Sequence, residues 1–329
     1  MRDDSDTSLA RHGAPDISVV VPIYNEEDSV APLHAAIVAA LEPMGRSFEI
    51  LFVDDGSKDA SIPRAVALAE ADLRLSIIQF QRNHGQTAAM HAGIEHARGR
   101  YIVTMDGDLQ NDPADIPMML GKLAEGYDLV VGWRMNRQDK FLSRKLPSKL
   151  ANKLIGKVTG LPIRDNGCSL KVYRADVIQK VPLYSDMHRF IPAMTIPVGA
   201  RIAEVGVHHH ARRFGESKYG LSRIFKVLLD LLVVKTLLHF ARRPLASFVN
   251  LALLMGLAAL ASALFIGPGT RGSEVVAMTV AGLLAAGAIF LSLCGVVTML
   301  AFRDKAVLEG TADVSVAGPG WPAWSNPKE

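Results

Sequence analysis

Between residues 17 and 105, the chain alternates short apolar runs with longer stretches of helix-like spacing. The apolar runs are rich in Val, Ile and Phe, as buried strands are. The stretches between them are rich in alanine and other helix formers. This alternation predicts βαβ units, and therefore an α/β domain with a mostly parallel sheet. The strands are expected at residues 17–24, 49–53, 75–80 and 101–105, and the helices at 27–41, 60–71 and 87–97.

Two long apolar runs stand out in the C-terminal third. Residues 245–266 and 275–302 are 22 and 28 positions without a charged side chain. About 20 residues suffice for a helix to cross the hydrocarbon core of a membrane. A buried helix of a soluble domain is the alternative, but two such runs in tandem favour membrane spans. The short connection at residues 267–274 then predicts a tight hairpin.

Basic residues flank this predicted hairpin. Arg242 and Arg243 precede the first run, and Arg303 and Lys305 follow the second. Positively charged residues near membrane spans favour the cytoplasmic side. We therefore expect a multi-pass protein of the cytoplasmic membrane, with both ends of the hairpin and the large N-terminal domain facing the cytoplasm.

Amphipathic and polar segments precede the hairpin. Residues 221–240 combine Arg223, Lys226 and Lys235 with a broad apolar face, which predicts a helix lying on the membrane surface. Nine Lys or Arg and three Asp or Glu lie between residues 201 and 243, a bias that attracts anionic headgroups. A solvated helix face is the alternative. Residues 1–16 are polar, lack a signal-peptide core and are expected to form a disordered leader.

The composition of the chain argues against several classes of protein. Hydrophobic residues make up 49% of the 329 positions and charged residues 21%, which excludes wholesale disorder. A net charge of +3 argues against a nucleic-acid partner. The chain has two cysteines, Cys168 and Cys294, so neither a disulfide framework nor a cysteine-rich zinc module is available.

Acidic residues follow two of the predicted strands. Asp54 and Asp55 come at the end of the second strand, and Asp106 and Asp108 follow the fourth. In open α/β sheets, ligands bind at the carboxyl ends of the strands. Oxygen ligands suit Mg²⁺ or Mn²⁺, which commonly hold substrate phosphates as well. A solvated turn is the alternative, and it would have to apply at both strand ends.

A basic cluster follows at residues 134–153, with seven Lys or Arg and one acidic residue. Arginine forks match phosphate oxygens, so this cluster could hold an anionic lipid head. A solvated basic helix is the alternative.

Several motifs together resemble a known enzyme family. Residues 18–27, 53–57 and 106–110 resemble the inverting family 2 glycosyltransferases with a GT-A fold, in which a Rossmann-like, mostly parallel sheet carries the catalytic site. Residues 132–137, 143–152 and 213–219 resemble the polyprenyl-phosphate branch, which includes dolichyl-phosphate mannose synthase and bacterial undecaprenyl-phosphate sugar transferases. The resemblance implies a glycosyltransferase domain at 17–218, interfacial helices at 219–243, two transmembrane helices within 244–303 and a cytoplasmic tail at 304–329.

The resemblance also implies roles for individual residues, in three groups. One group binds the nucleotide and its diphosphate, a second holds the metal ion, and a third binds the acceptor phosphate. The first group is Pro22, Tyr24, Glu26, Asp54, Asp55, Arg82, Arg213 and Lys218; the metal ligands are Asp106, Asp108 and Gln110; the acceptor residues are Arg134, Arg144 and Ser148.

Two further positions bear on the implied site. Asp165, in a segment ending at Cys168, is a candidate for recognising the donor sugar, with an ordinary turn as the alternative. With Asp106 and Asp108 it completes the candidate catalytic set. Asn111 departs from the family pattern, which often runs from Gln directly to Asp-Pro, and this puts in doubt whether Asp112 helps to position the metal. Cys168 is interpreted as a packed thiol, not a nucleophile.

The implied reaction moves one sugar from a nucleotide-sugar to polyprenyl phosphate with inversion, using Mg²⁺ or Mn²⁺. The metal and basic residues would stabilise the departing diphosphate. The acceptor phosphate is already anionic at neutral pH, so no strong general base is needed. The segment at 165–168 resembles that of bacterial enzymes that use UDP-sugars, which implies a UDP-sugar donor, with glucose, a uronic acid and an amino-arabinose derivative all open. Relatives can form homo-oligomers, and the sequence leaves that state open.

Three other functions compete with this interpretation. A GDP-mannose-dependent polyprenyl-phosphate synthase is the nearest. A processive polysaccharide synthase is disfavoured because the chain lacks a Gln-x-x-Arg-Trp motif and further spans. A non-catalytic membrane scaffold is disfavoured because it needs no metal-binding carboxylates.

Two patterns are interpreted as unrelated to cofactor binding. Residues 267–272 match Gly-x-Gly-x-x-Gly but sit between two apolar runs, so a hairpin turn is favoured over a dinucleotide site. Residues 208–210 are three consecutive histidines. Side chains alternate between faces along a strand, so the three are not expected to share one zinc ion.

Overall fold

A computed structural model describes residues 13–135, 146–181, 183, 187–211, 231, 233–236, 244–264, 271–303 and 314–317. The chain divides into two compact units. The first comprises Met1–Val234 with Thr311–Glu329, and the second is Lys235–Gly310.

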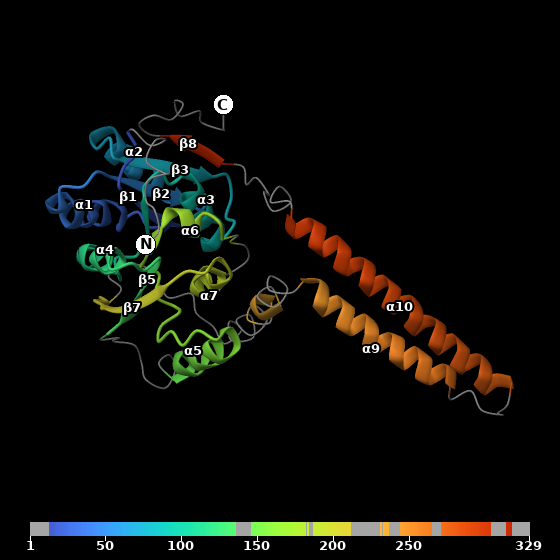
Figure 1. Ribbon diagram of the computed structural model, residues 1–329. Helices are drawn as coiled ribbons and strands as arrows, with labels where there is room; N and C mark the ends of the chain where they lie inside the picture. Colours follow the sequence, from blue (N-terminus) through green and yellow to red (C-terminus); the bar gives the residue numbers. More distant parts are fainter. Residues whose placement is uncertain are drawn as a thin grey trace. The chain divides into compact units, whose positions relative to one another are not determined.

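The first unit is built on an eight-stranded sheet in the order β7-β5-β6-β4-β1-β2-β3-β8 (Figure 1). Neighbouring strands are parallel from β3 through β2 and β1 to β4, and β5 is parallel to β7. β6 runs antiparallel to both β4 and β5, and β8 runs antiparallel to β3. The strands are β1 Ile17–Ile23, β2 Phe48–Asp54, β3 Leu75–Phe80, β4 Tyr101–Thr104, β5 Leu129–Arg134, β6 Lys171–Arg174, β7 Ile202–Val207 and β8 Val314–Ala317.

Helices cover both faces of this sheet. One hydrophobic cluster joins a sheet face to α1, α2 and α4, and a second joins the other face to α3, α6 and α7. Every residue of β1 and β2 is buried, as expected for strands covered on both sides. The helices are α1 Val30–Leu41, α2 Ser61–Ala71, α3 Gln86–His96, α4 Ile116–Ala124, α5 Leu146–Thr159, α6 Ala175–Ile178 and α7 Ile191–Met194, with short 3₁₀ turns η2 Glu42–Met44, η3 Pro113–Asp115, η5 Met187–Arg189 and η6 Ile196–Val198.

The sequence prediction of an α/β domain with a mostly parallel sheet is confirmed. The four expected strands and three expected helices are present, with ends that shift by a few residues at most. The C-terminal segment after residue 303, expected as a plain tail, contributes the edge strand β8. Residues 1–12 of the predicted leader and most of the predicted interfacial helix lie outside the described residues; Leu231 and residues 233–236 are helical.

Among its described residues, the second unit contains two long helices, α9 (Pro244–Leu264) and α10 (Arg271–Arg303). Within α10, Gly272–Val297 is long and apolar enough to cross a membrane, and Phe248–Leu264 is a shorter apolar stretch. The two helices pack closely, since a Cβ on Gly295 would meet the Cβ of Phe248 at 2.8 Å. Large apolar side chains point outward along both, with Leu257 64% and Leu283 69% exposed. This surface suits a lipid environment, and the two-span topology stays a prediction.

Candidate active site

The predicted acidic residues meet at one edge of the sheet. β2 ends at Asp54, which is fully buried, and β4 is followed by Asp106 and Asp108. β1 lies between these two strands and runs parallel to both, so the carboxyl ends of the three strands are neighbours. Gly107 lies against the end of β1, because a Cβ there would approach the backbone oxygen of Pro22 at 3.1 Å.

Asp54 and Asp55 shape the loops at this edge. Asp54 accepts hydrogen bonds from the backbone nitrogens of Gly56 and Ser57, each at 3.1 Å. Asp55 accepts from the backbone nitrogens of His84 at 2.6 Å and Gly85 at 2.9 Å. Burial raises the pKa of both carboxyls, and the donated hydrogen bonds partly offset that rise. The two side chains thus fix the loops after β2 and β3.

The other predicted nucleotide residues occupy the same edge. Pro22 is buried in β1, Tyr24 and Glu26 follow it and are half-buried, and Arg82 is exposed in the loop that Asp55 organises. Glu26 accepts a hydrogen bond from Ser29 Oγ at 3.1 Å. The predicted phosphate residues Arg213 and Lys218 lie outside the described residues.

The Asp106 carboxylate is enclosed more tightly than the sequence indicated. Gln86, the first residue of α3, donates from Nε2 to Asp106 Oδ1 at 2.5 Å. The carboxyl is surrounded by protein although the residue keeps some accessible surface, and this burial, followed by the charge of Asp108, raises the pKa of Asp106. Sequence reasoning missed Gln86, since no pattern links it to a residue 20 positions later.

The oxygen donors at this edge fit a hard divalent cation. A cation would relieve the repulsion between Asp106 and Asp108, and the Gln110 amide oxygen is the third predicted ligand. Asp108 Oδ1 accepts from the backbone nitrogen of Gln110 at 3.1 Å, so these two residues are locally coupled. Within the described part of the chain, no three His, Cys, Asp or Glu residues form a metal-binding group. Mg²⁺ is commonly held by one or two carboxylates together with water and substrate phosphates, so a pair of carboxylates fits such an ion.

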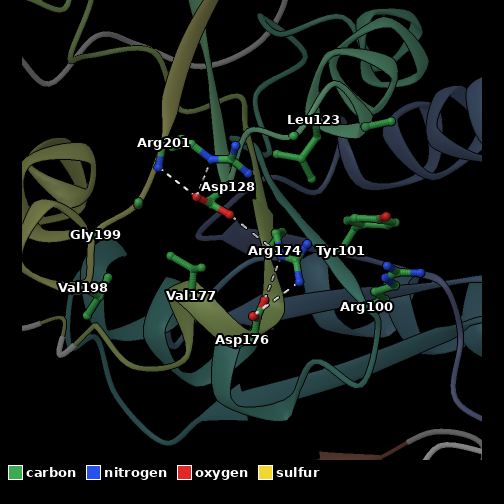
Figure 2. A pocket seen from close by; sticks show the side chains of 13 residues that line it. Arg100, Tyr101, Leu123, Asp128, Arg174, Asp176, Val177, Val198, Gly199 and Arg201 are labelled. Atoms are coloured by element: carbon green, nitrogen blue, oxygen red, sulfur yellow. Dashed lines mark hydrogen bonds and ion pairs between the residues drawn. The ribbon is translucent and has the colours of Figure 1, made fainter. Parts of the chain in front are cut away.

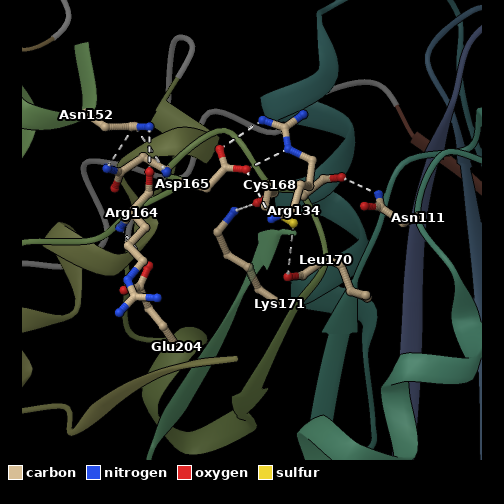
Figure 3. A network of polar contacts seen from close by, with 11 residues as sticks. Asn111, Arg134, Asn152, Arg164, Asp165, Cys168, Leu170, Lys171 and Glu204 are labelled. Carbon is tan, nitrogen blue, oxygen red and sulfur yellow. Dashed lines mark hydrogen bonds and ion pairs between the residues drawn. The ribbon is translucent and has the colours of Figure 1, made fainter. Parts of the chain in front are cut away.

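Arg134 and Asp165 form a bidentate ion pair beside the acidic residues. Arg134, the last residue of β5, donates from Nε to Asp165 Oδ2 at 2.6 Å and from a terminal nitrogen to Oδ1 at 2.8 Å (Figure 3). Their side chains are only 16% and 7% exposed. Asp165, together with Cys168 and Asp106, keeps the pKa of Arg134 above its usual value despite burial. The structure thus joins a predicted acceptor residue to the predicted sugar-recognition residue.

A buried lysine and thiol lie next to this pair. Lys171 is 2% exposed, and its Nζ donates to the backbone oxygen of Cys168. Burial lowers the pKa of Lys171, and the nearby Asp106 and Asp165 oppose that change. Burial also raises the pKa of the Cys168 thiol to about 11, which agrees with a packed thiol.

The remaining acceptor residues are described in part. Ser148 lies in α5, and only its backbone position is described; Arg144 lies outside the described residues. Asn111 Nδ2 donates to Ser169 Oγ at 2.7 Å, so the position that departs from the family pattern supports the loop before β6.

The three histidines face different partners. His208 Nδ1 lies 2.8 Å from Asp115 Oδ1, and His210 Nε2 lies 3.0 Å from Asp112 Oδ2. His209 pairs with Asn111 in an isolated antiparallel bridge. The segment therefore fastens the chain after the predicted metal ligands to the end of β7, and Asp112 contacts a histidine.

Comparison with known proteins identifies the family. A sequence model described as glycosyl transferase family 2 matches residues 18–181. A dodecaprenyl-phosphate galacturonate synthase from Rhizobium johnstonii is 50% identical over 256 residues, covering 77% of this chain and 76% of the relative. The chain belongs to glycosyltransferase family 2. This glycosyltransferase is also 43% identical over 222 residues to an undecaprenyl-phosphate 4-deoxy-4-formamido-L-arabinose transferase from Shewanella sediminis, covering 67% of this chain and 66% of the relative.

Solved structures confirm the fold of this glycosyltransferase. Glucosyl-3-phosphoglycerate synthase from Mycobacterium tuberculosis in complex with UDP matches with a TM-score of 0.53 and 18% identity, covering 68% of this chain and 80% of that chain. The same protein with Mn²⁺, UDP and phosphoglyceric acid matches with a TM-score of 0.52 and 19% identity, covering 67% and 78%. At this identity the likeness establishes the GT-A fold alone.

A pocket of about 570 Å³ lies at the other edge of the sheet (Figure 2). Arg100, Asp128 and Arg201 line it, and each precedes the first residue of a strand in the parallel set. Asp128 Oδ2 accepts from the backbone nitrogen of Arg201 at 2.8 Å, and Arg174 Nε lies 4.0 Å from Asp128 Oδ1. These ion pairs tie strand ends together, at the edge opposite the acidic residues of the candidate site.

Proposed function

We propose that this glycosyltransferase moves one sugar from a UDP-sugar to a polyprenyl phosphate, with Mg²⁺ or Mn²⁺ and with inversion at the sugar. The named relatives support the acceptor class, because one is named for dodecaprenyl phosphate and the other for undecaprenyl phosphate. The product would be a polyprenyl monophosphate sugar.

The observation that carries this proposal is that the predicted metal ligand Asp106 lies near Arg134, whose side chain is only 16% exposed. Asp106 and Asp108 would hold a cation that neutralises charge on the donor diphosphate. Arg134 lies close enough to Asp106 for the charge of that carboxylate to raise the pKa of Arg134. Negative charge would develop on the departing diphosphate, next to the cation held by Asp106 and Asp108. Arg134 would hold the attacking acceptor phosphate.

The Arg134–Asp165 ion pair restricts how the acceptor phosphate can bind to Arg134. Arg134 already has an anionic partner that takes two of its N–H donors, so an incoming phosphate must share the guanidinium with Asp165. A phosphate monoester carries a charge of about −1.5 to −2 at neutral pH and has three acceptor oxygens, which lets it compete. It also needs no general base to become a nucleophile.

Galacturonate is the proposed donor sugar. It is supported by the relative named as a galacturonate synthase, which matches over a longer stretch and at higher identity than the arabinose transferase. A 4-formamido-arabinose donor is the second candidate, because the arabinose transferase relative also covers two thirds of this chain.

The two-helix unit would place this site at the membrane surface. Residues on both sides of the helix pair, up to Val234 and from Thr311, belong to the same compact unit. Both ends of the pair are therefore expected on one side of the membrane, and the flanking arginines favour the cytoplasm. The Phe248–Leu264 stretch is short for a span, so α9 would cross with the help of its flanking residues.

A donor panel tests this proposal. The detergent-purified protein would be given undecaprenyl phosphate, Mn²⁺ or Mg²⁺, and in turn UDP-galacturonate, UDP-4-formamido-arabinose, UDP-glucose and GDP-mannose. We expect lipid-dependent UDP release with UDP-galacturonate, and its loss in Asp108→Ala. Release with UDP-4-formamido-arabinose alone would favour the second donor. Release that does not need the lipid would contradict the acceptor class.

A further inference from the structure

Asn152 connects α5 to both neighbours of Asp165 (Figure 3). Its Nδ2 donates to the backbone oxygen of Arg164 at 2.7 Å. Its Oδ1 accepts from the backbone nitrogen and from the side-chain Nδ2 of Asn166, each at 3.3 Å. One side chain thus binds the residues before and after Asp165.

These bonds help to set the direction of the Asp165 carboxylate, together with the hydrogen bond from the backbone nitrogen of Arg164 to Glu204 Oε1 at 2.7 Å. An aspartate side chain has only two rotatable bonds, so the backbone at residues 164–166 largely sets where its oxygens lie. Those oxygens hold Arg134 through two hydrogen bonds of 2.6 and 2.8 Å. The backbone nitrogen of Arg134 also lies 3.4 Å from Asp165 Oδ2. A continuous set of contacts therefore runs from α5, through Asp165, to the end of β5.

We propose that Asn152 is a positioning residue for the acceptor phosphate. It holds Asp165 so that Arg134 keeps one orientation relative to α5, the helix that also carries Ser148. This inference rests on the proposed function, since it takes the acceptor to be a prenyl phosphate. Within the described residues, the hydrogen bonds of the Asn152 side chain go to Arg164 and Asn166, not to Asp106 or Asp108, and its proposed role needs no contact with the substrate.

A positioning role and a purely structural role predict different results. If Asn152 only stabilised the loop, its removal would lower thermal stability and weaken donor and acceptor binding together. If it acts through Asp165, its removal affects acceptor binding selectively. That effect also disappears once Asp165 no longer forms the ion pair.

Binding measurements on the full-length protein separate the two roles. Dissociation constants for farnesyl phosphate, and for UDP with Mn²⁺, would be measured by calorimetry on the wild type, Asn152→Ala, Asp165→Asn and the double variant. We expect Asn152→Ala to weaken farnesyl phosphate binding about tenfold in the wild-type background and less than about twofold in the Asp165→Asn background. UDP binding should stay within about twofold throughout.

Two controls keep the result interpretable. Lys157→Ala removes an exposed residue of the same helix and should leave both dissociation constants unchanged. If Asn152→Ala does not fold, Asn152→Asp replaces it in the same double-mutant cycle with Asp165→Asn. This variant keeps an oxygen acceptor for Asn166 and loses the donor to Arg164.

The outcomes distinguish this inference from the proposed function. An equal loss in both backgrounds, or an equal loss of UDP binding, would overturn the positioning role. Absence of farnesyl phosphate binding by the wild type would overturn it as well. The wild type could bind farnesyl phosphate and lose affinity on Asn152→Ala only in the wild-type background, yet transfer no sugar to any polyprenyl phosphate. That result would contradict the proposed function and leave the positioning role standing.

Discussion

Gln86 and Asp106 are joined by a hydrogen bond of 2.5 Å from the first residue of α3 to the carboxylate that follows β4. The bond favours the charged form of a carboxyl whose pKa burial and Asp108 raise. Through it, the start of α3 supports a predicted metal ligand.

Replacing Gln86 should therefore weaken metal binding. Gln86→Ala removes a donor to the carboxylate, which raises the pKa of Asp106 further and lets protons compete with the cation. Loss of such a supporting residue typically costs 10-fold or more, so we expect Mn²⁺ affinity in the presence of UDP to fall about tenfold. Electron paramagnetic resonance of free Mn²⁺ measures this. Glu95→Gln, an exposed change on the same helix, serves as the control, and equal affinities in the two variants would refute the role.

Gly56 is expected to be essential for the donor loop. It has a φ of +74° and follows Asp54 and Asp55, and a Cβ there would approach the backbone carbon of Arg82 at 2.7 Å. Gly56→Ala should push the loop after β3 away and weaken UDP binding at least about tenfold, in addition to the strain of about 1–2 kcal/mol at positive φ.

Gly45→Ala is the matched control for this change. Gly45 also has a positive φ of +64°, but nothing lies within 4 Å of its added Cβ. It should lose stability by a similar strain and keep normal UDP binding in calorimetry. Equal losses of UDP affinity in both variants would show that backbone strain alone, not the contact with residue 82, is responsible.

The sequence predicted the strands and acidic residues of this site for a physical reason. Runs such as residues 17–23 are buried on both faces, so their hydrophobicity is continuous and easy to recognise. Acidic residues directly after such runs must then lie at the carboxyl edge. The nucleotide and metal roles of these residues stay predictions.

Contacts between distant segments were not predictable in the same way. Gln86 with Asp106, and Asn111 with Ser169, join residues 20 and 58 positions apart without a repeating pattern. The pairing of Arg134 with Asp165 depends on β6, and the pattern of the sequence did not predict its antiparallel insertion between β4 and β5. β7 was missed because it lies at the edge of the described sheet and only two of its six residues are buried.

A buried carboxylate on β2 should contribute strongly to stability. Glu49, 3% exposed, accepts from Ser18 Oγ at 2.6 Å and from the backbone nitrogen and guanidinium of Arg98. Glu49→Ala leaves the buried Ser18 hydroxyl without this acceptor, so we expect a loss of about 2 kcal/mol in the free energy of unfolding. Arg98 is half exposed, so its ion pair with Glu49 contributes little to this loss in the free energy of unfolding.

Chemical denaturation of the detergent-solubilised protein measures the Glu49 effect. Glu125→Gln, which breaks an exposed ion pair with Lys122, should change stability by less than about 0.5 kcal/mol. A loss in Glu49→Ala as small as in this control would contradict the buried network.

The His208–Asp115 contact should depend on pH. The hydrogen bond and charge of Asp115 raise the pKa of His208 above its ordinary value. A raised pKa means that the ion pair is fully present below the unfolded value of about 6.5 and is lost as pH rises through the folded pKa. Imidazole NMR should show His208 titrating above about 6.5 in the wild type and close to it in Asp115→Asn. Identical titrations in the two proteins would show that the carboxylate has no such effect.

Product analysis tests the central claim most directly. Full-length protein would be incubated with undecaprenyl phosphate, UDP-galacturonate and Mn²⁺, with Asp106→Asn as the control, and lipid and nucleotide products identified by mass spectrometry. The account predicts an undecaprenyl monophosphate galacturonate together with an equal amount of UDP, both absent in the control. Release of UMP with a lipid diphosphate sugar, or undiminished product in Asp106→Asn, would contradict it.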